Sequence, residues 1–322
     1  MIAFLFPGQG SQQVGMGREL AGAFPEARAT FDEADAAFCV GSIGADSVQP
    51  ASLTALCFEG PEDQLRLTEY TQPAILTVSI AAARVLASRG ITPDFVAGHS
   101  LGEYSANVVA GTFAFGDAVA VVRRRGRYMQ EAVPVGQGAM SAILGLDVAA
   151  VRLACADAAL GDVVAPANVN SRDQVVIAGA AAAVERAGVL AKERGAKRVM
   201  PLPVSAPFHC ALMKPAEERL APELRALAIQ DPRVPVVANV DAEPKTDGGA
   251  AVDALVRQVS SPVRWEEIVQ RLASEGVTTY VEVGVGRVLS GLVRKIRKDA
   301  KVLSFGSPED LFDVEQALGS TT

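Results

Sequence analysis

The stretch GHSLGEYSA, residues 98–106, has a serine at its centre and glycines two residues before and two residues after it. The apolar residues 95–97 precede it and predict a short buried strand, and residues 101–110 predict a helix that Gly111 ends. A serine on a sharp turn between a strand and a helix is the arrangement of a nucleophile elbow. The stretch therefore predicts an α/β fold in which Ser100 is a candidate nucleophile.

The composition is typical of a globular protein that buries a large core. Of the 322 residues, 49% are hydrophobic and 21% are charged, and the length suggests roughly two domains. The net charge of −7 argues against a general nucleic-acid binder. The longest apolar run, residues 74–83, is too short to span a membrane, and the sequence start MIAFLFPGQG lacks the features of a signal peptide. The four cysteines of the chain form no CxxC pair, so we expect reduced thiols and a cytoplasmic protein.

Alternating strand and helix patterns predict the domain organisation. Residues 138–204 read as β-α-β-β-α-β, the order of a ferredoxin-like unit. Strands are predicted on both sides of this unit, at residues 2–6, 95–97, 234–240 and 278–283, with helices at 17–38, 73–89 and around Trp265. Residues 39–52 predict a surface loop. We therefore expect a main α/β domain with a mostly parallel sheet, residues 1–126 and 205–322, that carries a small inserted domain, residues 127–204.

A serine nucleophile needs a base, and the chain has only two histidines. His99 adjoins Ser100, and the side chains of neighbours on a tight turn diverge. This leaves His209, in the loop sequence PVSAPFHCALM, as the candidate base, with a structural loop histidine as the alternative. No acid that would orient the imidazole is recognisable from the pattern.

An oxyanion needs N–H donors near the nucleophile. The main-chain N–H of Leu101 follows Ser100 at the start of a helix, and the turn after the first predicted strand, residues 8–10, is a candidate for the second donor. The alternative for this turn is a phosphate-binding loop, but the lysine of a P-loop is absent there.

Arg125 falls in the apolar stripe of a helix predicted at residues 117–131, whereas Arg123, Arg124 and Arg127 are predicted to point away. A buried arginine requires an anionic partner, which would be either an internal carboxylate or the carboxylate of a substrate. The scattered histidines and cysteines predict no metal site. The basic residues within 287–301 predict a solvated face or a docking surface for an acidic protein.

Seven ordered blocks of the sequence resemble the malonyl-CoA:acyl-carrier-protein transacylase family, and together they cover nearly the whole chain. They are FPGQGSQ at 6–12, GHSLGEYSA at 98–106, RGRYMQEAVPVGQGAM at 125–140, NVNSRDQVVIAG at 168–179, PVSAPFHCALMKP at 203–215, QVSSPVRW at 258–265 and VEVGVGRVLSGL at 281–292. The resemblance implies an α/β-hydrolase-like domain with a ferredoxin-like insertion and an active site between the two.

The resemblance also implies roles for particular residues. Ser100 would accept the acyl group, His209 would be its base, and Gln258 would orient the histidine through an oxygen in place of an acid. Gln9 and Leu101 would supply the oxyanion hole. Arg125 would bind the malonyl carboxylate, with His99 and Phe208 also at the substrate, and Phe208 would crowd an α-methyl group.

The implied activity is transfer of a malonyl group from malonyl-CoA to the phosphopantetheine thiol of acyl carrier protein, through a malonyl-serine. We expect no cofactor, no metal, no nucleic acid or membrane as partner, and a monomer. Two alternatives keep the same residues: a stand-alone acyltransferase that serves a polyketide synthase, and a serine thioesterase or esterase. A third is a non-catalytic binding module, which the presence of Ser100, His209 and Arg125 together disfavours.

Overall fold

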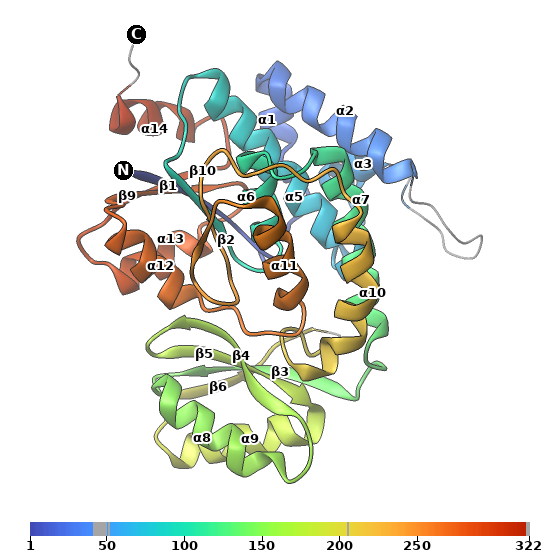
Figure 1. The fold of residues 1–322 in the computed structure, drawn as a ribbon, viewed down its shortest axis with the longest axis vertical. Helices are drawn as coiled ribbons and strands as arrows, with labels where there is room; N and C mark the ends of the chain where they lie inside the picture. Colours follow the sequence, from blue (N-terminus) through green and yellow to red (C-terminus); the bar gives the residue numbers. More distant parts are fainter. Residues whose placement is uncertain (41–49, 51, 205, 320–322) are drawn as a thin grey trace.

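The computed structural model describes residues 1–40, 50, 52–204 and 206–319. Within these residues the strands form two sheets (Figure 1). The larger has the order β10-β9-β1-β2-β7-β8, and all neighbouring strands are parallel except β7 and β8. Its strands are β1 (Ile2–Phe6), β2 (Phe95–Gly98), β7 (Val236–Val237), β8 (Pro244–Lys245), β9 (Thr279–Val283) and β10 (Lys301–Phe305). The prediction of a mostly parallel sheet is confirmed.

Helices cover both faces of the parallel sheet, as the alternation of side chains along β1 requires. Phe4 and Phe6 belong to the main core, whereas Ala3 and Leu5 belong to a second apolar cluster that includes Trp265. The helices that contribute to the main core are α1 (Arg18–Ala23), α2 (Pro25–Val40), α3 (Leu53–Glu59), α4 (Glu62–Leu65), α5 (Thr68–Ser88), α6 (Gly102–Ala110), α7 (Phe115–Glu131), α10 (Lys214–Arg225), α11 (Gly248–Gln258) and α14 (Asp310–Leu318). The second cluster lies under α12 (Trp265–Ser274) and α13 (Val288–Ile296).

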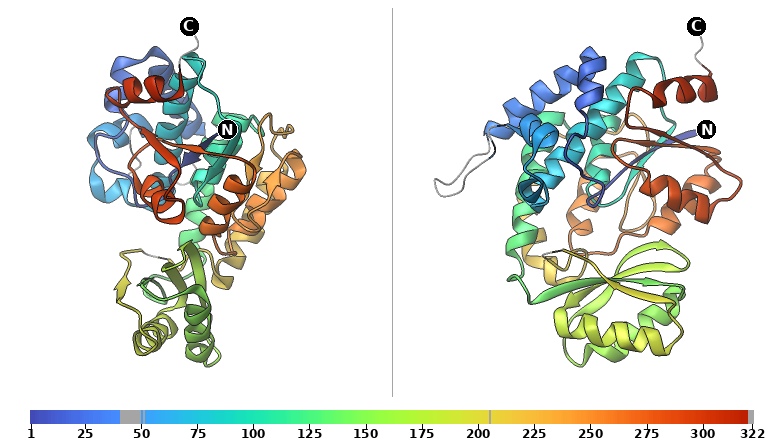
Figure 2. Two further views of the ribbon diagram at one scale, coloured as in Figure 1. Left: turned by 90° about the vertical axis from the view of Figure 1, so that its left-hand side faces the viewer. Right: turned by 180° about the vertical axis from the view of Figure 1, so that it is seen from behind.

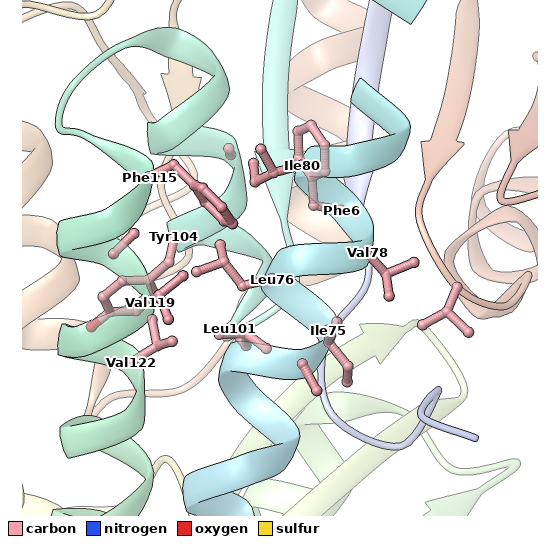
Figure 3. Close-up of a cluster of buried hydrophobic side chains, with 14 of the residues drawn as sticks. Phe6, Ile75, Leu76, Val78, Ile80, Leu101, Tyr104, Phe115, Val119 and Val122 are labelled. Carbon is pink, nitrogen blue, oxygen red and sulfur yellow. The ribbon is translucent and has the colours of Figure 1, made fainter. Parts of the chain in front are cut away.

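The long helix α5 lies at the centre of the main core. Figure 3 shows Leu76 of this helix among side chains of α6 and α7, with Phe6 of β1 close by. Helix α6, which follows the Ser100 turn, and helix α7, which carries Arg125, therefore both pack against α5.

The smaller sheet is antiparallel and has the order β4-β5-β3-β6. Its elements are β3 (Gly138–Leu144), α8 (Val148–Ala159), β4 (Val164–Ser171), β5 (Gln174–Ala180), α9 (Ala181–Glu193) and β6 (Arg198–Pro201), which is the predicted ferredoxin-like order. Both views in Figure 2 place this unit at the opposite end of the molecule from the N-terminus and α14. Helix α7 runs through the predicted boundary at residues 126 and 127; the division into domains stays a prediction.

The two sheets are joined by more than the connecting chain. Val175 and Ile177 of β5 pack on α8 and α9, while Val176 and Ala178, which alternate with them along the strand, belong to the main core. Main-chain hydrogen bonds also pair Val263 with β4. The smaller sheet is therefore packed on both faces, which fixes β4 beside the large unit.

Several predicted boundaries are wrong for local reasons. The helix predicted at 17–38 is two helices, because Phe24 is extended and Pro25 starts α2. The helix predicted from Pro73 starts at Thr68, so Pro73 lies inside it. The strand predicted at 234–240 pairs only over β7. Residues 41–49 and 51 of the predicted surface loop lie outside the described residues.

Candidate active site

Ser100 lies on a tight turn between β2 and α6 and has a φ of 52°, in the left-handed region. Glycine is required at both flanking positions, because other main-chain atoms lie too close to leave room for a side chain. A Cβ atom on Gly98 would lie 1.9 Å from the carbonyl carbon of Gly102, and one on Gly102 would lie 2.0 Å from the main-chain oxygen of Phe6. The spacing of glycines around Ser100 therefore follows from the geometry of the turn and its contact with β1.

Gly102→Ala should destabilise the protein strongly, because the added methyl group collides with the main chain of β1 in the centre of the sheet. We expect a loss of about 3 kcal/mol or more and a fall in Tm of roughly 5 °C or more, measured by thermal unfolding. Gly291→Ala is the matched control, because a Cβ there meets nothing within 4 Å on helix α13. A wild-type Tm for Gly102→Ala would contradict the packing described for the turn.

The imidazole of His209 lies against Ser100. His209 Nε2 is 2.7 Å from Ser100 Oγ, and His209 Nδ1 is 3.0 Å from the main-chain oxygen of Gln258. Because a carbonyl oxygen only accepts, Nδ1 carries the proton and Nε2 is free to accept the hydroxyl proton of Ser100. Burial, followed by the positive charge of Arg125, lowers the pKa of His209 to about 3. The imidazole is therefore neutral near pH 7, as a general base must be.

The group that orients His209 is thus a main-chain oxygen. Gln258 stands at the end of α11, and its side chain has other partners: Nε2 donates to the main-chain oxygen of Ser100 (2.8 Å) and to Glu103 Oε2 (2.7 Å), and Oε1 accepts from Arg125 (2.8 Å). The carboxylate that completes many serine-histidine sites is replaced here by a carbonyl dipole.

Arg125 is 2% exposed, as its place in the apolar stripe of α7 predicts. Its guanidinium donates to Ser100 Oγ (3.1 Å), to Gln258 Oε1 and to Gln72 Oε1 (2.7 Å), and it lies 5.2 Å from the ring centroid of Tyr104. In the described parts of the chain, no carboxylate lies within 4.0 Å of it, so the internal salt bridge left open by the sequence is not formed there. Burial lowers the pKa of Arg125. A buried cation with neutral partners faces the candidate nucleophile and can accept an anionic group.

The prediction that Arg123 points away from the core is wrong. Arg123 is 2% exposed, donates to the main-chain oxygen of Phe38 (2.9 Å) and stacks 4.1 Å from the centroid of that ring. Helix α7 packs against both α5 and α2, so its buried surface is wider than a single apolar stripe.

The two candidate oxyanion donors flank the turn. Leu101 N–H lies at the start of α6, and the loop with Gln9 follows β1, whose last residue accepts a main-chain hydrogen bond from His99 (3.0 Å). Across residues 1–40, 50, 52–204 and 206–319, neither the Leu101 nor the Gln9 main-chain N–H has a hydrogen-bond acceptor, and the Gln9 side chain accepts from Thr68 Oγ1 (2.7 Å). Both N–H groups are thus available to a ligand.

His99 and Phe208 border these residues. The His99 ring is tilted against Trp265 at 5.5 Å between centroids, and its Nε2 is 2.9 Å from Asn170 Oδ1 on β4. It therefore points away from Ser100 and towards the smaller sheet, and burial lowers its pKa. Phe208 is buried next to His209 in the sequence.

Three buried polar residues of the site were not singled out from the sequence. They are Gln72, Glu103 and Asn239, at 2%, 1% and 0% exposure. Burial raises the pKa of Glu103 to about 7. The one local sequence signal that could indicate such a residue is a polar side chain on the apolar face of a helix. Gln72 and Glu103 have this signal. In the residues that the structure describes, no cluster of three or more His, Cys, Asp or Glu side chains could hold a metal ion.

Comparison with known proteins decides the family. The model of the acyl transferase domain matches residues 3–304. The chain belongs to the acyl transferase domain family. It is 50% identical over 311 residues to the malonyl CoA-acyl carrier protein transacylase of Bacillus subtilis, covering 96% of this chain and 95% of that protein. It is 53% identical over 296 residues to the Escherichia coli K12 protein of the same name, covering 92% of each.

Solved structures of this family share the whole fold. The acyl carrier protein S-malonyltransferase from Vibrio cholerae gives a TM-score of 0.92 at 48% identity, over 97% of this chain and 99% of that one. A malonyl-transacylase in complex with a type II polyketide synthase acyl-carrier protein gives 0.93 at 45% identity, over 98% and 99%. No helix in the described residues is long and apolar enough to cross a membrane.

Proposed function

We propose that this acyltransferase moves a malonyl group from malonyl-CoA to the phosphopantetheine thiol of an acyl carrier protein, through a malonyl ester on Ser100. The observation that carries the proposal is the buried guanidinium of Arg125, which donates to Ser100 Oγ and has no carboxylate partner in the described residues. An acyl group on Ser100 that ends in a carboxylate would supply that partner. The names of the relatives support the same substrate and acceptor.

The first half-reaction follows from the contacts of Ser100. His209 Nε2 removes the hydroxyl proton while Oγ attacks the thioester carbon of malonyl-CoA. The carbonyl oxygen becomes an oxyanion next to the N–H groups of Leu101 and Gln9. As the C–S bond breaks, the histidinium returns the proton to the leaving thiolate of CoA. The products are the malonyl ester of Ser100 and free CoA, which leaves the site.

The second half-reaction reverses these roles with a new thiol. The phosphopantetheine thiol gives its proton to His209 and attacks the ester carbon, and the same two N–H groups stabilise the oxyanion. Collapse breaks the bond to Ser100 Oγ, which regains its proton from the histidinium. The main-chain oxygen of Gln258 accepts from Nδ1 throughout and stabilises the positive charge on the imidazole.

Arg125 selects the acyl group in this proposal. Its Nη2 lies 3.1 Å from Ser100 Oγ, and its Nε has no hydrogen-bond partner in the described residues, so a carboxylate carried by the acyl group can pair with the guanidinium beside the nucleophile. Phe208, next to the base, would crowd an α-methyl substituent. A monomeric state, a cytoplasmic location and the substrate contacts of His99 stay predictions.

Steady-state kinetics test the reaction class. We expect parallel lines in double-reciprocal plots when malonyl-CoA and holo acyl carrier protein are varied, as ping-pong transfer requires. CoA release without the carrier protein should be at least about 100-fold slower than with it. Equal release rates with and without the carrier would favour the thioesterase alternative. Carrier proteins from fatty acid and polyketide systems, compared by kcat/KM, separate the two transferase alternatives.

His209→Ala should slow both half-reactions by about 10²–10⁴-fold, because one imidazole serves both proton transfers. Each step can be followed by rapid quench, with malonyl-CoA alone for the first and with isolated malonyl-enzyme and carrier protein for the second. Arg123→Ala is the control, since that side chain is equally buried on the neighbouring helix α7 but donates to the main-chain oxygen of Phe38. An effect of His209→Ala on only one half-reaction would mean that a second base exists.

A further inference from the structure

The turn at Ser100 is closed by one buried side chain that the mechanism does not use. Asn239 Oδ1 accepts from the main-chain N–H of Ser100 (2.8 Å), and Asn239 Nδ2 donates to the main-chain oxygen of Gly98 (2.7 Å). These two groups lie on either side of His99. A single carboxamide, 0% exposed, therefore joins both ends of the turn with one acceptor and one donor.

The turn needs such support, because Ser100 has a φ of 52°. Residues other than glycine rarely adopt this conformation, and it persists where the surrounding structure fixes it. Released from Asn239, the turn is free to relax towards an ordinary backbone conformation, and Ser100 Oγ would move relative to His209 Nε2.

Asn239 is itself held by Glu103, in the first turn of α6. Glu103 Oε2 accepts from the main-chain N–H of Asn239 (3.1 Å) and from Gln258 Nε2 (2.7 Å). The same Gln258 Nε2 donates to the main-chain oxygen of Ser100 (2.8 Å). Glu103 is 1% exposed. Its carboxylate oxygen thus connects α6 to Gln258 at the end of α11 and to Asn239 after β7.

We propose that Asn239 and Glu103 are positioning residues that hold the Ser100 turn in its left-handed conformation and so keep Oγ in reach of His209. In the described residues, neither side chain makes a hydrogen bond to Ser100 Oγ or to the His209 imidazole; Asn239 acts through the main chain of the turn, and Glu103 acts through Asn239 and Gln258. The inference rests on the proposed function insofar as Ser100 is the nucleophile.

Asn239→Asp tests the first residue with almost no change in shape. The aspartate keeps an oxygen for the Ser100 N–H but places a second oxygen against the carbonyl of Gly98, where the donor was. We expect the rate constant for acylation per active site to fall about 10–100-fold, since a displacement near 1 Å has effects of this size. The KM for malonyl-CoA should stay within about twofold.

Asn107→Asp is the matched control. Asn107 is also 0% exposed and lies one turn further along α6, where its Nδ2 donates to the main-chain oxygen of Glu103. It makes no bond to residues 98–100. We expect it to lower Tm while leaving the rate constant per active site within about threefold of wild type.

The readout is labelling of Ser100 by a fluorophosphonate, followed by intact-protein mass spectrometry. The amplitude counts folded active sites and the rate constant reports the reactivity of each, so a loss of folded protein does not mimic a loss of positioning. A rate constant per site for Asn239→Asp equal to that of wild type and of Asn107→Asp would overturn the proposal.

Glu103→Gln and Glu103→Ala test the second residue and remain informative if Asn239→Asp does not fold. Glutamine keeps an oxygen that can accept from both Asn239 and Gln258, and alanine removes it. We expect Glu103→Gln to stay within about threefold of wild type per site and Glu103→Ala to fall about 10–100-fold. Equal rate constants for the two variants would overturn the role of Glu103.

The probe also separates the two proposals. Wild-type protein that reacts with the fluorophosphonate at Ser100 but not with malonyl-CoA would contradict the proposed function and leave the positioning test intact. Wild-type protein that does not react at Ser100 with either reagent would overturn both.

Discussion

Ser100→Ala protein mixed with malonyl-CoA should keep its unmodified mass, and its release of CoA in the presence of holo carrier protein should fall at least about 10⁴-fold. The hydroxyl is the group that His209 Nε2 contacts at 2.7 Å, and alanine leaves no atom there to accept the acyl group. Rapid-quench mass spectrometry and CoA release measure the two effects.

Ser105→Ala is the control for this result. Ser105 is fully buried in α6, the helix that follows the Ser100 turn, and its Oγ has no hydrogen-bond partner in the described residues, so its removal should leave adduct formation unchanged. A full burst of malonyl adduct on Ser100→Ala would remove Ser100 from its role.

Arg125→Ala should reverse the acyl preference of the enzyme. We expect turnover of malonyl-CoA to fall about 100-fold or more, which corresponds to about 3 kcal/mol, because the malonyl carboxylate would enter a buried site without a cation. Turnover of acetyl-CoA should be kept or should rise, since this substrate has no carboxylate to bind. The measurement is kcat/KM for both acyl-CoAs.

Arg123→Ala is the matched control for Arg125→Ala. It removes a second guanidinium of the same helix, equally buried but bound at Phe38. We expect lower thermal stability and no change in the ratio of the two kcat/KM values. If Arg125→Ala lowers kcat/KM equally for malonyl-CoA and acetyl-CoA, the role of Arg125 is structural.

The elements around Ser100 could be predicted because their signals are local. Glycine spacing, the apolar residues 95–97 and the helix ended by Gly111 are short-range patterns, and the strands and helices of residues 138–201 alternate with clear periods. Boundaries that depend on tertiary packing were wrong. Pro73 is tolerated inside α5 because that helix is buried along its length, and β7 is short because only Val236 and Val237 meet a partner strand.

The site was predictable only in part. His209 follows from the scarcity of histidines, and the burial of Arg125 follows from helical periodicity. The oxygen that orients His209 is a main-chain oxygen. Every residue has one, so no residue type in the sequence indicates which residue supplies it. Asn239 meets Ser100 across 139 residues of sequence, and Gln72 meets Arg125 across 53, and such long-range contacts leave no local pattern.

The transfer proposed for Ser100 can be observed directly by following the malonyl group itself. Wild-type protein is mixed with malonyl-CoA, freed of excess substrate, analysed by intact mass and peptide mapping, and then mixed with holo acyl carrier protein. The proposed mechanism predicts one malonyl adduct on Ser100, which disappears as the mass of the carrier rises by one malonyl group. An adduct that decays to free malonate while the carrier stays unmodified would contradict it.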